Sequence, residues 1–113
     1  MNMENFKFQV VREKYSRVNN VTICELSVTL NASGTKKLFT AVGKSYCAED
    51  DNFDKKTGRL IARARAYREI YAKAKESLIR LQNRVEYIQN CISHNIMRVD
   101  RLINNERTFI NKF

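Results

Sequence analysis

The chain has 113 residues, of which 21 are Lys or Arg and 12 are Asp or Glu, so its net charge is +9. This length suits a modest hydrophobic core, and we predict a single domain spanning residues 1–113. The charge excludes a protein mimic of DNA, which would need a strongly acidic surface, and it favours an anionic partner. The three cysteines are widely spaced without a paired motif, which predicts reduced thiols.

Residues 1–48 are typical of an antiparallel β meander. Alternating apolar and polar residues, followed by a run of β-forming and small residues, predict three strands, over 6–11, 23–30 and 38–47. The predicted turns are Asn19–Asn20 and Asn31–Thr35, where Gly34 can supply a positive φ. A sheet this small needs a packing partner, and the helical region that follows is the only candidate.

Residues 49–58 form an acidic junction between the predicted sheet and the predicted helix. Four acidic residues fall between Glu49 and Asp54, where negative charge favours the positive end of a following helix. Asp51 or Asp54 can cap that helix, and Phe53 can fix the entry of the chain onto the sheet.

Residues 59–113 contain no Gly and no Pro, and they predict a long helical region. Apolar residues in it follow strict 4-3 spacing, which marks one narrow face for packing against another helix. We call this face the apolar seam. It comprises Leu60, Ala64, Tyr67, Tyr71, Ala74, Leu78, Leu81, Val85, Ile88, Ile92, Val99, Leu102, Phe109 and Phe113, interrupted by Asn95 and Glu106. Beside it runs the isoleucine row, which is Ile96, Ile103 and Ile110.

A single helix of this length would be about 80 Å long. Either it turns back on itself or it buries its seam against other copies of the chain. The predicted turning points are polar clusters, at 89–90, 93–95 and 104–105, because Asn tolerates helix ends. We therefore predict an α+β fold: a small three-stranded antiparallel sheet followed by one long helix or, as we favour, two long helices. The helices are expected to join copies into a homo-oligomer, a dimer or higher.

The sequence offers no convincing catalytic set. His94 is the only histidine, which excludes a multi-His metal site and leaves no spare base for a Ser or Cys relay. No paired carboxylates have a spacing that indicates hydrolysis. We expect no enzyme activity, no cofactor and no metal. The first residues lack a signal-peptide layout and no apolar run is long enough to span a membrane, so we expect an intracellular protein without a membrane partner.

The helical region is also the expected place for an anion. Residues 59–113 hold 12 basic and 5 acidic residues, and Arg outnumbers Lys by nine to three. Guanidinium groups suit phosphate better than ammonium groups do. Ion pairs within the helix can use some arginines, but we expect Arg59, Arg63, Arg68, Arg98 and Arg101 to stay unpaired. The predicted ligand-binding residues are Arg59, Arg63, Arg68, Asn90, His94, Asn95, Arg98, Arg101 and Arg107.

One composite motif carries a resemblance to a known family. It comprises Gly43, Cys47, Glu49–Asp50, Phe53–Asp54, Gly58, Ile61–Ala62 and Arg65–Ala66. This motif resembles the strand-to-helix junction of small phage proteins, including the Thoeris anti-defence sponge family. The resemblance covers residues 38–70 and assigns no ligand-binding residue. It implies a non-enzymatic phage protein in the host cytoplasm that sequesters cyclic ADP-ribose isomers or cyclic oligonucleotides made as immune signals.

Two other functions stay open. A basic phage protein could bind nucleic acid, for instance as an inhibitor of a CRISPR nuclease, with the helix along a phosphate backbone. A structural coiled-coil adaptor would use its arginines only for solubility. Arginine mixed with Asn beside a self-association seam favours a small anionic cyclic nucleotide, bound in pockets between subunits.

Overall fold

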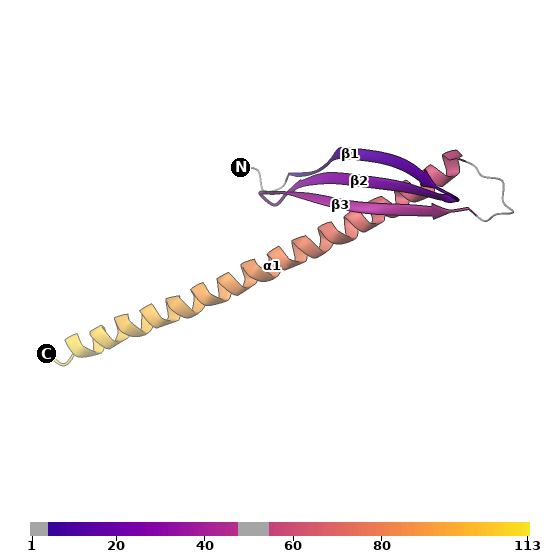
Figure 1. The fold of residues 1–113 in the computed structure, drawn as a ribbon. Helices are drawn as coiled ribbons and strands as arrows, with labels where there is room; N and C mark the ends of the chain where they lie inside the picture. Colours follow the sequence, from indigo (N-terminus) through magenta and orange to yellow (C-terminus); the bar gives the residue numbers. More distant parts are fainter. Residues whose placement is uncertain (1–4, 48–54) are drawn as a thin grey trace. The chain divides into compact units, whose positions relative to one another are not determined.

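The computed structural model describes residues 5–47 and 55–113. It contains three strands and one helix: β1 (Phe6–Val18), β2 (Val21–Ala32), β3 (Thr35–Tyr46) and α1 (Lys55–Ile110) (Figure 1). The predicted α+β architecture is therefore confirmed. The chain divides into two units, residues 1–76 and 77–113, and each is described by itself. The predicted cap and plug of the acidic junction, Asp51, Asp54 and Phe53, lie outside the described residues.

The sheet is antiparallel with the order β1-β2-β3. All three strands are longer than predicted, and β1 continues from Val11 to Val18. The pairing register of β1 against β2 shifts between Val10 and Arg12, which is the mark of a β-bulge. The sequence hides this extension because most residues after the bulge are polar and β1 is exposed along most of its length. Alternation therefore gives little signal there.

Both hairpin turns fall where the sequence predicts them. Asn19 has a φ of 55°, and its carbonyl accepts a hydrogen bond from Nε of Arg17 at 2.9 Å. In the second turn Ser33 and Gly34 have φ values of 53° and 76°. Two successive positive φ values are typical of the type I′ turn that joins tightly paired strands. The Thr35 hydroxyl also donates to the carbonyl of Ala32 at 2.8 Å.

The core of the first unit lies between one face of the sheet and the start of α1 (Figure 1). Alternate residues of β2 point into it, including Cys24, Leu26 and Val28, which are 0–1% exposed. The helix packs against these strand residues with a row of mostly small side chains at four-residue spacing. The row is Gly58, Ala62, Ala66, Ile70 and Ala74. Small side chains let the helix backbone come close to the strands. The predicted packing of the helix on the sheet is confirmed.

Contact is closest at Gly43 of β3. A Cβ atom placed on Gly43 would overlap the backbone carbonyl of Ala62 and would lie 2.5 Å from the backbone nitrogen of Ala66. Real Cβ atoms do not approach backbone atoms this closely. Glycine is therefore required at this crossing point of strand and helix.

The favoured prediction of two helices is wrong. The segments at 89–90, 93–95 and 104–105 all lie within α1, which is 56 residues long. Asn and Ser lower helix propensity by less than about 1 kcal/mol each, far less than Pro would. Polar residues alone do not end a helix that lacks a glycine at the right place.

Residues 77–113, the second unit, present the apolar seam to solvent. Every residue from Gln82 to Phe113 is exposed. Among them are Val85, Ile88, Ile92, Val99 and Leu102, each 47–63% exposed. Within the described residues nothing covers this stripe, so the long helix indicates association between copies of the chain. No helix in the described part of the chain is both long and apolar enough to cross a membrane.

Candidate anion-binding site

Two of the predicted ligand-binding arginines contact strand β1. The Arg63 Nε donates to Oε1 of Glu13 at 2.9 Å, and its guanidinium lies 4.7 Å from the centre of the Tyr67 ring. The Arg59 guanidinium lies 5.3 Å from the centre of the Tyr15 ring. The expectation that Arg63 is unpaired is therefore wrong. Its partner is fifty positions away in the sequence, so spacing along the helix could not reveal it.

The same region shifts the ionisation of several groups. Burial, with nearby Cys24 and Glu13, raises the pKa of Tyr15 to about 12. Burial also raises the pKa of the Cys24 thiol, so this residue behaves as a small apolar side chain. The hydrogen bond to Glu13 raises the pKa of Arg63 further. A neutral phenol, a neutral thiol and a satisfied ion pair are the features of a stable contact, and they offer no reactive nucleophile.

Arg68 lies at a shallow cleft between α1 and β3, away from the contacts of Arg59 and Arg63 with β1. The cleft has a volume of about 590 Å³ and is lined by residues of β3 and α1: Val42, Gly43, Lys44, Tyr46, Arg65, Arg68, Glu69 and Ala72. A second cleft of about 420 Å³ is lined by Tyr15, Lys55, Lys56, Arg59 and Leu60. Both clefts are basic, and both are open to solvent on a single chain. Neither encloses a small ligand by itself.

Two cationic side chains of the helix donate hydrogen bonds to backbone carbonyls on the outer edge of β3. Arg65 Nη1 donates to the backbone carbonyl of Lys44 at 2.6 Å, and Lys73 Nζ donates to that of Thr40 at 2.6 Å. These carbonyls are four residues apart on an edge strand, where outward-facing backbone groups lack a strand partner. Lys73 also contacts Glu69 at 3.4 Å. Arg65 and Lys73 therefore hold the helix on the sheet and block this edge.

The family-like motif of the sequence has a structural explanation in its described part. Gly43, Ala62 and Ala66 form the close crossing of strand and helix, and Gly58 is buried in the same row. Arg65 ties the helix to the edge of β3. These residues are required for packing, so the motif marks the fold and does not locate a ligand.

The remaining predicted site residues belong to the second unit. Asn90, His94, Asn95, Arg98, Arg101 and Arg107 are all exposed on α1. Asn90, His94, Arg98 and Arg101 follow one another at three- or four-residue spacing, so they share one side of the helix. Asn95 lies in the apolar seam, and Arg107 lies on a different side. Within the described residues, Arg98 and Arg101 have no hydrogen-bond or ion-pair partner, and neither does Arg68.

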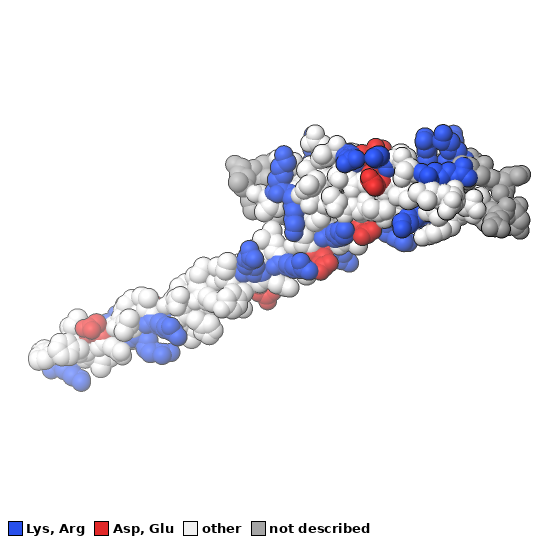
Figure 2. Space-filling model, in the orientation of Figure 1, with Lys and Arg blue, Asp and Glu red and all other residues white. Residues whose placement is uncertain are grey.

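Sequence reasoning missed a basic surface on the sheet. The face of the sheet turned away from α1 carries Lys7, Arg12, Lys14, Lys36 and Lys44 but only one acidic residue, Glu25. Figure 2 shows that Lys and Arg outnumber Asp and Glu over the sheet. The strand alternation contained this signal. The net charge of residues 1–58 does not reveal this surface, because the acidic residues between Glu49 and Asp54 offset the cations of the strands.

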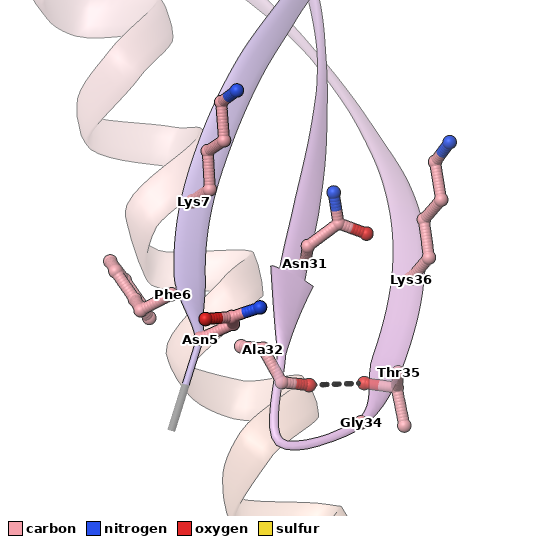
Figure 3. Close-up of a pocket in the computed structure, with 8 residues that line it drawn as sticks. All are labelled: Asn5, Phe6, Lys7, Asn31, Ala32, Gly34, Thr35 and Lys36. Atoms are coloured by element: carbon pink, nitrogen blue, oxygen red, sulfur yellow. Dashed lines mark hydrogen bonds between the residues drawn. The ribbon is translucent and has the colours of Figure 1, made fainter. Parts of the chain in front are cut away.

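Part of this surface forms a cleft of about 660 Å³ beside the second hairpin turn. Lys7, Asn31 and Lys36 are paired neighbours on β1, β2 and β3. Figure 3 shows their side chains on one face of the sheet, whereas Phe6 points away from them. Two ammonium groups flank one amide, an arrangement that can bind an anion weakly at an open surface.

Among residues 5–47 and 55–113, no three His, Cys, Asp or Glu side chains gather as metal ligands. Comparison of the chain with protein-family models, with curated proteins and with solved structures finds no match. The functional conclusion therefore depends on the residues themselves: an uncovered apolar seam, with arginines beside it that no described residue engages.

Proposed function

We propose that the protein is a non-enzymatic phage anti-defence protein that self-associates and sequesters a small phosphate-bearing cyclic nucleotide. The ligand class is a cyclic ADP-ribose isomer or a cyclic oligonucleotide, bound at arginine-lined pockets between copies. One observation carries this proposal: the uncovered apolar seam of α1 lies next to arginines that have no partner among the described residues.

The open clefts of a single chain support the need for a second copy. A small-molecule site usually surrounds most of its ligand, and the clefts at Arg59 and Arg68 are open on one side. A pocket that closes only on association would place guanidinium groups around the ligand and exclude water from their contacts with phosphate. Arg98 and Arg101 are the strongest candidates, because Arg63 already has Glu13 as a partner.

The test is a calorimetric titration of the purified protein with a cyclic ADP-ribose isomer and with cyclic di-AMP. We expect saturable binding of one of them, lost in Arg98→Glu and Arg101→Glu because each variant replaces a phosphate-binding cation with an anion. Arg84→Glu makes the same change of charge elsewhere on α1 and should bind like the wild type. Heating the complex should then release intact ligand, as shown by chromatography.

Two results would contradict this proposal. Recovery of degraded nucleotide would indicate an enzyme, and absence of binding to both probes would remove the sequestering role.

The second candidate is nucleic-acid binding, and the basic face of the sheet is the observation that favours it. Five cations against one carboxylate on an open surface can neutralise a phosphate backbone. The face offers little for reading bases, since Tyr46 is its only aromatic residue among those described. This candidate would be favoured if the protein bound neither nucleotide but bound DNA with an affinity that falls steeply as the salt concentration rises.

A further inference from the structure

The second unit presents an uncovered apolar face that a second copy of the same helix can cover. Between residues 88 and 113, nine large apolar side chains of the apolar seam and the isoleucine row are 45–93% exposed. They are Ile88, Ile92, Ile96, Val99, Leu102, Ile103, Phe109, Ile110 and Phe113. A second copy of this helix segment would supply a matching apolar face of the same length.

The two polar interruptions of the apolar seam decide how the second copy lies. Asn95 and Glu106 each interrupt the seam, and a polar group buried between helices needs a hydrogen-bond partner. If two helices run antiparallel, with their two-fold axis between Asp100 and Arg101, Asn95 lies opposite Glu106 of the second copy. The Asn95 amide can then donate to the Glu106 carboxylate, so both interruptions are satisfied together.

The apolar positions agree with the same arrangement. In this pairing Val99 lies opposite Leu102, Ile92 opposite Phe109, and Ile88 opposite Phe113. The rings of Phe109 and Phe113 already contact one another at 5.0 Å between centroids, so they present one aromatic surface to Ile88 and Ile92. Each seam residue thus meets an apolar partner, and large aromatic side chains meet medium-sized isoleucines.

The isoleucine row finds a partner in this pairing as well. On one side of the seam, Ile96 lies diagonally across from Ile103 of the second copy, which explains why the apolar stripe broadens only near the end of the chain. On the other side, Arg98 lies diagonally across from Asn105 of the second copy, near the two-fold axis.

Other arrangements leave polar or charged groups without a partner. A parallel pair in register would place Glu106 against Glu106 and would set Ile103 against Arg98. An antiparallel pair shifted by one heptad would set Asn95 against Val99 and Glu106 against Ile88. Each alternative buries a polar or charged group among apolar side chains or against a like charge.

We propose that residues 88–110 of α1 form an antiparallel helix pair with a second copy of this chain, with the two-fold axis between Asp100 and Arg101 and with Phe113, in the turn after the helix, beside Ile88 of the second copy. The pairing also gathers Arg98 and Arg101 of both copies on one side of the axis. Four guanidinium groups there repel one another until an anion binds, so they suit a ligand with two phosphates. This second part builds on the proposed nucleotide binding, whereas the helix pairing does not depend on it.

Cysteine cross-linking tests the pairing. We would use Cys91→Ser as the parent, because Cys91 is an exposed thiol on this helix, and add Ile92→Cys in one chain and Phe109→Cys in another. Mild oxidation should link the two chains when they are co-expressed and should link neither chain to its own kind. Residues 92 of two antiparallel copies lie about 25 Å apart along the axis at 1.5 Å per residue.

Ile88→Cys with Phe113→Cys is the second pair, in case the first disturbs association. The parent without an added cysteine should give no linked species. Linkage of Ile92→Cys with itself would overturn the proposal in favour of a parallel pair. Failure of both mixed pairs to cross-link would overturn it too.

The anion part has its own readout. Whichever of the two nucleotides binds in the calorimetric titration, the cyclic ADP-ribose isomer or cyclic di-AMP, should tighten the association of wild-type chains by about tenfold in sedimentation equilibrium, because ligand and partner binding are reciprocally coupled. Arg101→Glu should remove this effect while the cross-linked pair still forms. Cross-linking without any effect of the probe would keep the pairing and contradict the nucleotide site. An effect of the probe without cross-linking would support the nucleotide site and contradict the helix pairing.

Discussion

At the scale of single residues, most of the chemistry near the sheet is structural. Arg63, which the sequence predicts to be an unpaired phosphate-binding cation, pairs with Glu13, and Arg65 binds the carbonyl of Lys44. Their partners lie 50 and 21 positions away, so only the fold shows them. By contrast, the turn at Gly34 was predictable, because its requirement for positive φ is local. Local conformation can be predicted from sequence more readily than long-range polar pairing.

Tyr15 gives a prediction at this scale. Its pKa of about 12 lies above the value of 10.0 that an unperturbed tyrosine has. Between these values the unfolded chain loses the Tyr15 proton while the folded chain keeps it. The stabilising contribution of this residue is therefore complete below pH 10 and is lost as the pH rises towards 12. Urea unfolding from pH 9 to 12 should show a steeper loss of stability in the wild type than in Tyr15→Phe.

Tyr87→Phe is the matched control for this titration, because Tyr87 is 69% exposed. It should follow the wild type. If Tyr15→Phe lost stability with pH as steeply as the wild type does, the burial of Tyr15 against Cys24 and Glu13 would be contradicted.

At the scale of elements, α1 carries two apolar faces, and the sequence reveals one of them clearly. The apolar seam stands out because its side chains are large. The face that packs on the sheet is built mainly from Gly58, Ala62 and Ala66, which look unremarkable in a hydrophobic pattern, and Ala74 belongs to both faces. The continuity of the helix was also misjudged, since Asn clusters indicate turns only where the backbone can take a positive φ.

Gly43→Ala tests the close crossing of β3 and α1. The added methyl group would overlap the Ala62 carbonyl, so the helix must move away from the strand. We expect a loss of about 3 kcal/mol in the free energy of unfolding, measured by urea denaturation. Val42→Ala, one residue away on the opposite face, should cost less than about 1 kcal/mol. Equal effects of the two substitutions would contradict the packing described here.

At the scale of the whole molecule, the fold explains the sheet but leaves most of the helix without a partner. The sheet and the first turns of α1 bury one another, and residues 82–113 bury nothing. The self-association that the sequence predicts follows from this imbalance. The candidate site could be predicted only in part, because Arg98 and Arg101 would gain neighbours only in the proposed helix pair, and the sequence pattern alone does not show how two copies meet.

Sedimentation equilibrium of the purified chain tests the central claim, which is that the apolar seam joins copies of this protein. The wild type should sediment as a multiple of 13.3 kDa. Val99→Glu should shift it towards the monomer by burying a charge in the seam. Met97→Glu should not, because Met97 lies on another side of the helix, outside the apolar seam. A wild-type mass of 13.3 kDa at all concentrations would contradict the account.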